Sequence, residues 1–187
     1  VKKHLEKLDK TRETQRKQRL TQGVPLICLV GYTNAGKSSI LNALTHSDVL
    51  AKDQLFATLD TTTRQLQFQG KKIGLLSDTV GFIQQLPHQL INAFKSTLSE
   101  LKYASLLLVV IDIADNNWRS HIDVVLQTLD DIEIDKEMLF VFNKIDRLER
   151  SELQKRLSSF GFFAPYVAVS CTKPTGLNPL RKYLEKW

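Results

Sequence analysis

The chain has 187 residues, of which 42% are apolar and 25% charged, which is enough for one α/β domain with a full core. No apolar run approaches the roughly 20 residues that a membrane-spanning helix needs, so we expect no stable insertion into a bilayer. Two cysteines, Cys28 and Cys171, are too few for a disulfide framework, so we expect reduced thiols and a cytoplasmic location.

The first 20 residues hold eight Lys/Arg and three Asp/Glu, so they account for +5 of the net charge of +6. Val1, Leu5 and Leu8 recur at helical spacing, which predicts a helix over 1–20. Because this helix begins without Met or an N-cap residue, we interpret 1–22 as a basic arm that ends a missing upstream domain. Such an arm fits an RNA or ribosome partner, although a solvated helix without a ligand explains the charge equally well.

Strands and helices alternate from residue 23 to residue 187, which predicts a second unit with a parallel sheet covered on both faces. Leu66–Phe68 alternates with polar residues before a turn at Gly70, so we expect an edge strand antiparallel to the next one. The predicted fold class is α/β, with a mostly parallel six-stranded sheet flanked by helices. The other expected strands are Leu26–Val30, Lys72–Ser77, Leu106–Ile111, Met138–Phe142 and Tyr166–Val169, and the expected helices are Gly36–Leu44, His88–Tyr103, Arg119–Asp131, Ser151–Ser158 and Leu177–Lys186.

A phosphate-binding pattern, G-x-x-x-x-G-K-[ST], lies between the first strand and the first helix of this unit. Glycines let successive backbone N–H groups point at phosphate oxygens, and the helix start adds its positive dipole end. Lys37 would contact the β- and γ-phosphates, and the Ser38 hydroxyl would bind Mg²⁺. The predicted nucleotide contacts here are Gly31, Tyr32, Thr33, Asn34, Ala35, Gly36, Lys37, Ser38 and Ser39.

A second motif, Asp78-Thr79-Val80-Gly81, follows the strand Lys72–Ser77. Asp78 would hold Mg²⁺ as a Walker-B-type carboxylate, and the Gly81 N–H would contact the γ-phosphate. A loop turn explains an isolated Asp-x-x-Gly equally well. Its distance downstream of the phosphate-binding loop favours the nucleotide interpretation.

A base-reading motif, Asn143-Lys144-Ile145-Asp146, follows the strand Met138–Phe142. A carboxylate at Asp146 can accept hydrogen bonds from N1–H and the exocyclic amine of guanine together, a donor pair that adenine lacks. Lys144 would lay its stem along the base, and Asn143 would tie the base loop to the phosphate loop. Ser170-Cys171-Thr172 follows the last strand and would contribute backbone N–H groups. We therefore predict a site for GTP and GDP.

A threonine in the segment Phe56–Arg64, which contains four, is expected to complete the Mg²⁺ shell when GTP is bound. Its first residues, Phe56-Ala57-Thr58-Leu59-Asp60, are also predicted nucleotide contacts. We favour Thr58, because Phe-x-Thr-Leu resembles the corresponding segment of Obg-type GTPases, and Thr62 is the alternative. The residues expected to act in hydrolysis are Lys37, Thr58 and Gly81, and the expected metal ligands are Ser38, Thr58 and Asp78.

The whole chain resembles the G domain of the HflX family of ribosome-associated GTPases. The most specific stretch is Asp78–His88, continued by Ala93-Phe94 and Thr97-Leu98, and the arm also resembles the helical lead-in of that family. The resemblance implies a P-loop NTPase fold of Ras-like type, magnesium-dependent GTP hydrolysis, and a partner in the large ribosomal subunit with its ribosomal RNA. Thr61 departs from the usual proline of the family, and Cys171 from the usual alanine.

Phe82 stands where Ras-like proteins carry the glutamine that orients the attacking water. Phenylalanine cannot position water, so we expect slow hydrolysis by the chain alone. The alternative is a passive guanine-nucleotide binding module with vestigial hydrolysis. A P-loop kinase is disfavoured by Asn143–Asp146. A monomer is the default expectation for the oligomeric state.

Overall fold

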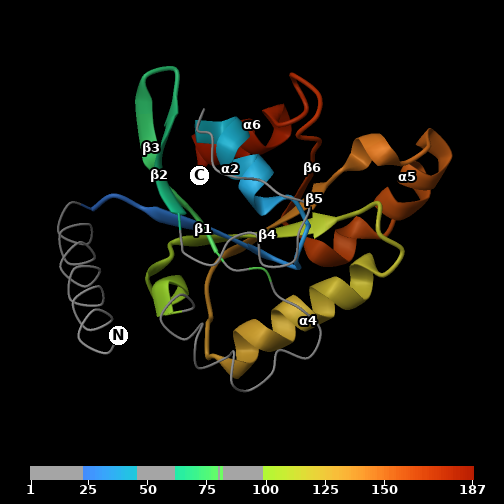
Figure 1. The fold of residues 1–187 in the computed structure, drawn as a ribbon, viewed down its shortest axis with the longest axis horizontal. Coiled ribbons are helices and arrows are strands. Elements are labelled where there is room, and N and C mark those ends of the chain that lie inside the picture. The colour runs from blue at the N-terminus through green and yellow to red at the C-terminus, as the bar shows by residue number, and fades with distance from the viewer. Residues whose placement is uncertain (1–22, 46–61, 80, 82–98) are drawn as a thin grey trace, which may run out of the picture.

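The computed structural model of the chain describes residues 23–45, 62–79, 81 and 99–187. The predicted basic arm at 1–22 lies outside these ranges. The described residues form a six-stranded sheet in the order β2-β3-β1-β4-β5-β6 (Figure 1). The strands are β1 (Leu26–Gly31), β2 (Thr62–Phe68), β3 (Lys71–Asp78), β4 (Leu106–Asp112), β5 (Met138–Asn143) and β6 (Tyr166–Ala168).

The strand β1 lies in the middle of the sheet, parallel to both β3 and β4. Its apolar run has no exposed position, as expected for a strand covered on both faces. In β4, side chains alternate between the two layers of the core. Leu107 and Val109 belong to one apolar cluster, and Leu106 and Leu108 belong to the other.

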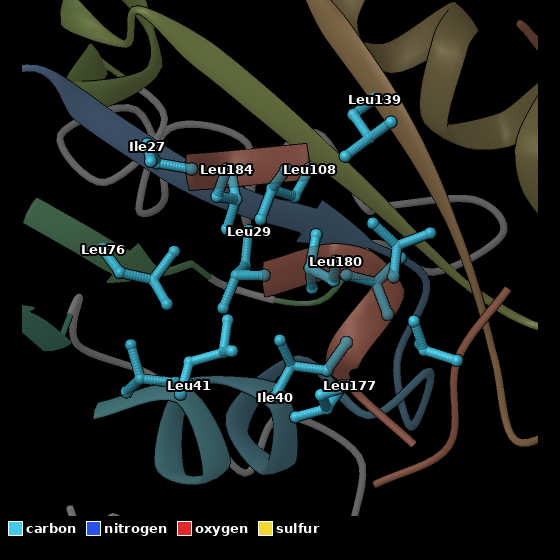
Figure 2. Close-up of a cluster of buried hydrophobic side chains, with 14 of the residues drawn as sticks. Ile27, Leu29, Ile40, Leu41, Leu76, Leu108, Leu139, Leu177, Leu180 and Leu184 are labelled. Carbon is cyan, nitrogen blue, oxygen red and sulfur yellow. The ribbon is translucent and has the colours of Figure 1, made fainter. Parts of the chain in front are cut away.

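Helices cover the two faces of the sheet separately (Figure 1). The helices α2 (Lys37–Thr45) and α6 (Asn178–Lys186) pack on one face, where Leu41 and Leu184 meet Ile27 and Leu29 of β1 (Figure 2). The helix α4 (Trp118–Asp131) packs on the other through Ile122 and its neighbours. Burying each such leucine or isoleucine contributes about 1.5–3 kcal/mol, so these apolar faces hold the helices against the sheet.

The predicted sheet is confirmed: β2 runs antiparallel to β3, and all other strand pairs are parallel. The helix α5 (Arg150–Leu157) is also present as expected. The predicted helix His88–Tyr103 is wrong where it can be compared: Ser99–Tyr103 is a 3₁₀ helix. This tighter winding buries Leu101 and lets the Ala104 N–H bond to its carbonyl immediately before β4, and the rest of that range lies outside the described residues. Two further 3₁₀ turns, Ile145–Arg147 and Phe160–Phe163, were not predicted.

The parallel strands all end at the same edge of the sheet. Asp78, Asp112 and Asn143 are the last residues of β3, β4 and β5, and Gly31 ends β1. In open α/β sheets ligands bind at this edge, beyond the carboxyl ends of the strands. The topology therefore gathers the predicted motifs in one place. No helix within the described parts of the chain is long and apolar enough to cross a membrane.

Candidate functional site

The predicted phosphate-binding loop connects β1 to α2. Asn34 adopts the left-handed conformation with φ of 59°, which asparagine tolerates better than most residues. Gly36 has φ of 99°, and a Cβ at this position would overlap the Asn143 side-chain nitrogen. The loop therefore needs glycine both for its conformation and for the close approach of the base motif.

Lys37 begins α2, and its side chain is buried with 6% exposure. Its Nζ donates to the carbonyl oxygens of Gly31 at 3.1 Å and Tyr32 at 3.0 Å. Burial lowers the pKa of Lys37 to about 8, an effect that the nearby Asp78 carboxylate partly offsets. The ammonium thus lies against the loop, where an anion would restore the stabilisation that it loses by leaving water.

Ser38 and Asp78 form the predicted magnesium pair. The Ser38 hydroxyl donates to Asp78 Oδ2 at 2.6 Å, and Asp78 is fully buried at the end of β3. Mg²⁺ prefers such hard oxygen ligands and is commonly bound through one or two carboxylates together with phosphates. The described residues contain no group of three His, Cys, Asp or Glu side chains that could hold a metal by themselves. The pair therefore fits an ion that shares its ligands with a nucleotide.

The Asp-x-x-Gly motif lies directly on the phosphate-binding loop. A Cβ at Gly81 would come within 2.9 Å of Thr33 Cγ2 and 3.1 Å of Lys37 Nζ. The Thr79 hydroxyl donates to the Leu29 carbonyl at 2.6 Å, so this side chain fastens the motif to β1 rather than facing a ligand. The predicted nucleotide contact of Thr79 would therefore be made by its backbone.

The threonine segment Phe56–Asp60, with its favoured residue Thr58, lies outside the described residues, as do Val80 and Phe82. Thr62 is described, and it pairs with Asp78 in the register of β2 and β3. It therefore lies in a strand beside the magnesium pair.

The base motif reaches the phosphate-binding loop at two neighbouring carbonyls. Asn143 Nδ2 donates to the Ala35 carbonyl at 3.0 Å, and Lys144 Nζ donates to the Asn34 carbonyl at 2.7 Å. Lys144 has a left-handed backbone with φ of 63°, which turns the chain out of β5 and into the loop that carries Asp146. Residues more than 100 positions apart in the sequence thus form one continuous surface.

Asp146 is held ready as an ionised acceptor. Its Oδ1 accepts a 2.6 Å hydrogen bond from the Ser170 hydroxyl. Burial alone would raise the pKa of Asp146, but hydrogen bonds from Ser170, the backbone and Thr172 outweigh it and lower the pKa. The carboxylate is therefore charged at neutral pH, which is the form that can accept two hydrogen bonds from guanine.

The Ser170-Cys171-Thr172 segment contributes side chains as well as backbone. Ser170 lies 2.9 Å from the Thr172 hydroxyl, and the Cys171 thiol donates to Asn143 Oδ1 at 3.6 Å. Burial raises the pKa of Cys171 to about 11, so the thiol is neutral. From the sequence we predicted only backbone contacts for this segment. The side-chain contacts of Ser170 and Thr172 could not be predicted, because they depend on how β5 and β6 pair in the sheet.

Two further residues contact the predicted site without belonging to any motif. The Asp112 carboxylate lies 2.7 Å from the Lys144 ammonium. The His121 ring of α4 stacks on Tyr32, with centroids 3.9 Å apart and planes 6° from parallel. Both residues line a pocket of about 160 Å³ beside the phosphate-binding loop. A single Asp after a strand and a single His in a helix carry no sequence signal that would have identified them.

Comparison with known proteins gives relatives for this arrangement. A protein-family model described as 50S ribosome-binding GTPase matches residues 26–144. The chain is 45% identical over 189 residues to GTPase HflX of Magnetococcus marinus, covering 100% of this chain and 43% of that protein. It is 46% identical over 186 residues to GTPase HflX of Lacrimispora saccharolytica, covering 99% of this chain and 43% of that protein.

A solved structure of a GTP-binding protein also resembles this chain. A GTP-binding protein from the hyperthermophilic archaeon Sulfolobus solfataricus, in complex with GDP, aligns with a TM-score of 0.65 and 29% identity. The alignment covers 99% of this chain and 57% of that chain. The P-loop GTPase fold and the resemblance to HflX GTPases that the motifs predicted are thereby confirmed. The chain spans less than half the length of the two curated relatives.

Proposed function

Because the chain belongs to the family of 50S ribosome-binding GTPases, we propose that residues 23–187 are the GTP-binding and GTP-hydrolysing domain of an HflX-type protein that acts at the large ribosomal subunit. One observation carries the nucleotide site. Asn143 and Lys144 donate to the carbonyls of Ala35 and Asn34, so the base-reading and phosphate-binding motifs form one binding surface.

Phosphate binding rests on the loop from Gly31 to Ser39. Its backbone N–H groups and the first turn of α2 face the phosphates, and the buried Lys37 ammonium neutralises their charge. Ser38 and Asp78, with Thr58 from the segment outside the described residues, would hold Mg²⁺. A bound Mg²⁺ would neutralise part of the phosphate charge.

Guanine selection rests on Asp146. The hydrogen bond from Ser170 fixes its carboxylate, and the lowered pKa keeps it ionised. An adenine ring would cover this carboxylate without offering the donor pair, and an acceptor that loses water without gaining donors is costly. The Lys144 stem would lie along the base plane.

Hydrolysis requires a water to be positioned at the γ-phosphate. A Cβ at Gly81 would lie 3.1 Å from Lys37 Nζ, so this residue is close to the buried lysine, and its N–H is the group of this chain that would contact that phosphate. Phe82 cannot orient a water, so we propose slow hydrolysis that a partner accelerates. The passive binding module remains the competing function.

The proposed partner is the large ribosomal subunit with its ribosomal RNA, which agrees with the description of the matching family. The basic arm at 1–22 would contribute to that contact through its +5 charge. We propose a cytoplasmic monomer.

The test of the base site is Asp146→Asn. A carboxamide reverses one hydrogen-bond polarity, so GTP affinity should fall roughly 10–100-fold and xanthosine triphosphate affinity should rise. Both are measured by titration with fluorescent nucleotides. Asp123→Asn, which removes an exposed carboxylate from α4, is the matched control. Unchanged GTP affinity in Asp146→Asn would show that guanine is read elsewhere.

A further inference from the structure

The Lys144 ammonium is held from two sides. It lies 2.7 Å from the Asn34 carbonyl and 2.7 Å from Asp112 Oδ2. The side chains of Lys144 and Asp112 are 12% and 18% exposed, so water screens this ion pair less than one on the open surface. The sequence motif predicted only that the Lys144 stem lies along the base, and it gave no partner for the ammonium.

The fold fixes the Asp112 carboxylate in place. Asp112 ends β4 and pairs with Asn143 in the register of β4 and β5, which sets it directly beside the base motif. Its other oxygen, Oδ1, accepts the Ala114 N–H at 3.0 Å. The hydrogen bond to the backbone restricts the rotamer of Asp112. Its Oδ2 therefore stays in one position, where it pairs with the Lys144 ammonium.

We infer that Asp112 is a positioning residue of the guanine site, acting through Lys144; this inference rests on the proposed nucleotide site. Lysine has a long, flexible stem, and ordering such a side chain costs entropy. Asp112 holds the ammonium before the ligand arrives, so the stem already lies where the base would pack. It also keeps the ammonium on the Asn34 carbonyl, which ties the base loop to the phosphate-binding loop.

The predicted effect is on binding and not on the chemical step. Removing the Asp112 charge leaves Lys144 with the Asn34 carbonyl alone, so the lysine samples other rotamers and the nucleotide escapes faster. Asp112 makes no described contact with Lys37, Ser38 or Asp78, which surround the phosphate site. The rate of hydrolysis of bound GTP should therefore stay near that of the unmodified chain.

The experiment compares Asp112→Asn with Asp115→Asn. Asp115 lines the same pocket, but its Oδ1 accepts the Asn117 N–H and it makes no described ion pair with Lys144. Dissociation of N-methylanthraniloyl-GDP is followed by stopped-flow fluorescence. Asp112→Asn should accelerate it about tenfold, equivalent to about 1.4 kcal/mol, and Asp115→Asn should leave it unchanged. Equal acceleration by both variants would overturn the inference, because the loss of any negative charge near the pocket would then explain the faster dissociation.

A double-mutant cycle separates positioning from a structural role. Lys144→Met keeps an unbranched apolar stem and removes the ammonium. Asp112→Asn should accelerate dissociation in the unmodified chain and add nothing in the Lys144→Met background. An equal effect in both backgrounds would show that Asp112 acts without Lys144. Single-turnover GTP hydrolysis should differ less than about twofold between Asp112→Asn and the unmodified chain.

Two outcomes are kept apart by the design. If the unmodified chain binds neither GDP nor GTP, the proposed nucleotide site fails. If it binds them and Asp112→Asn dissociates at the same rate, only the positioning role fails. If Asp112→Asn does not fold, Asp112→Glu replaces it. Glutamate keeps the negative charge but places the carboxylate one methylene farther from the backbone, so this variant should accelerate nucleotide dissociation by less than about tenfold.

Discussion

At the scale of single residues, the buried lysine of the phosphate-binding loop is the most informative group. Lys37 gains two carbonyl partners and a nearby carboxylate, yet its pKa still falls to about 8 because burial removes water from the ammonium. A phosphate group would favour the charged ammonium and raise the pKa again, so nucleotide binding and protonation of Lys37 are linked.

This linkage predicts a pH dependence of GDP affinity. Below pH 8 Lys37 is already charged in the free protein, and binding needs no added proton. Above pH 8 the free lysine is increasingly neutral, so binding must take up a proton and affinity falls as pH rises. Between pH 7.5 and 8.5 the dissociation constant should increase about threefold. Isothermal titration in buffers of different ionisation enthalpy measures the proton uptake directly.

The control for this dependence is Lys37→Arg. A guanidinium stays charged throughout the range, so the pH effect that belongs to Lys37 should disappear, while any deprotonation of the guanine base remains. If the two proteins show the same pH dependence, the lowered lysine pKa is not what governs affinity.

At the scale of elements, one arginine joins α5 to the end of β4. Arg156 donates to the carbonyls of Ile113 and Asp115 and pairs with Glu152 one turn away in its own helix. These carbonyls belong to the loop that follows Asp112. One terminal nitrogen of the guanidinium, Nη1, donates to both carbonyls, and Nε donates to Glu152, so a single side chain joins the loop to the helix.

Replacing Arg156 with Ala should therefore lower the free energy of unfolding by about 1–3 kcal/mol, because two loop carbonyls lose their partner. The neighbouring Lys155 is exposed, and Lys155→Ala serves as the matched control. Urea unfolding followed by circular dichroism gives both values. If Lys155→Ala lowers the free energy of unfolding as much as Arg156→Ala does, the effect comes from the charge of the helix and not from the loop contacts.

The order of strands and helices could be predicted because each apolar run has the length and period of its element. Leu106–Ile111 is a continuous buried run, and Leu66–Phe68 alternates as an edge strand should. The 3₁₀ helix at Ser99–Tyr103 could not be distinguished from an α-helix, since both bury residues at similar spacing. Its form is decided by how Leu101 and Ala104 pack under the sheet.

Some residues of the candidate site could likewise be predicted from the sequence, and others could not. Lys37, Asp78 and Asn143 could be placed from sequence because each lies in a motif of fixed spacing after its own strand. Asp112 could not, because its partner Lys144 lies 32 residues away and meets it only through the pairing of β4 with β5. Contacts set by sheet register leave no trace in local sequence.

At the scale of the whole molecule, the chain should bind GTP and GDP well but hydrolyse GTP slowly, far below a typical enzyme rate of about 10 per second. The residue directly after Gly81 is Phe82 and not glutamine, and the absence of a positioned catalytic group in a GTPase can cost about 10³–10⁵-fold in rate. Large ribosomal subunits should stimulate a full-length HflX relative strongly and this chain less, since this chain spans 43% of the length of each of the two curated relatives.

Steady-state phosphate release, with and without purified large subunits, measures this difference for the chain and for a full-length protein. Small ribosomal subunits serve as the control for nonspecific RNA effects. Rapid turnover by the chain alone would mean that residues 1–187 contain a catalytic group other than those proposed. No stimulation of the full-length protein would favour the passive binding module.

The two tryptophans of the protein lie in different surroundings, one in an aromatic cluster at the start of α4 and the other near the surface. Trp118 is 3% exposed and its ring meets those of Phe142, Phe160 and Phe163, whereas Trp187 is 38% exposed at the end of α6. The sequence holds no other tryptophan. Trp118 lies one turn before His121, whose ring stacks on the phosphate-binding loop. Trp118 is thus one helical turn and one ring contact from the loop, so we expect its fluorescence to change when a nucleotide binds there.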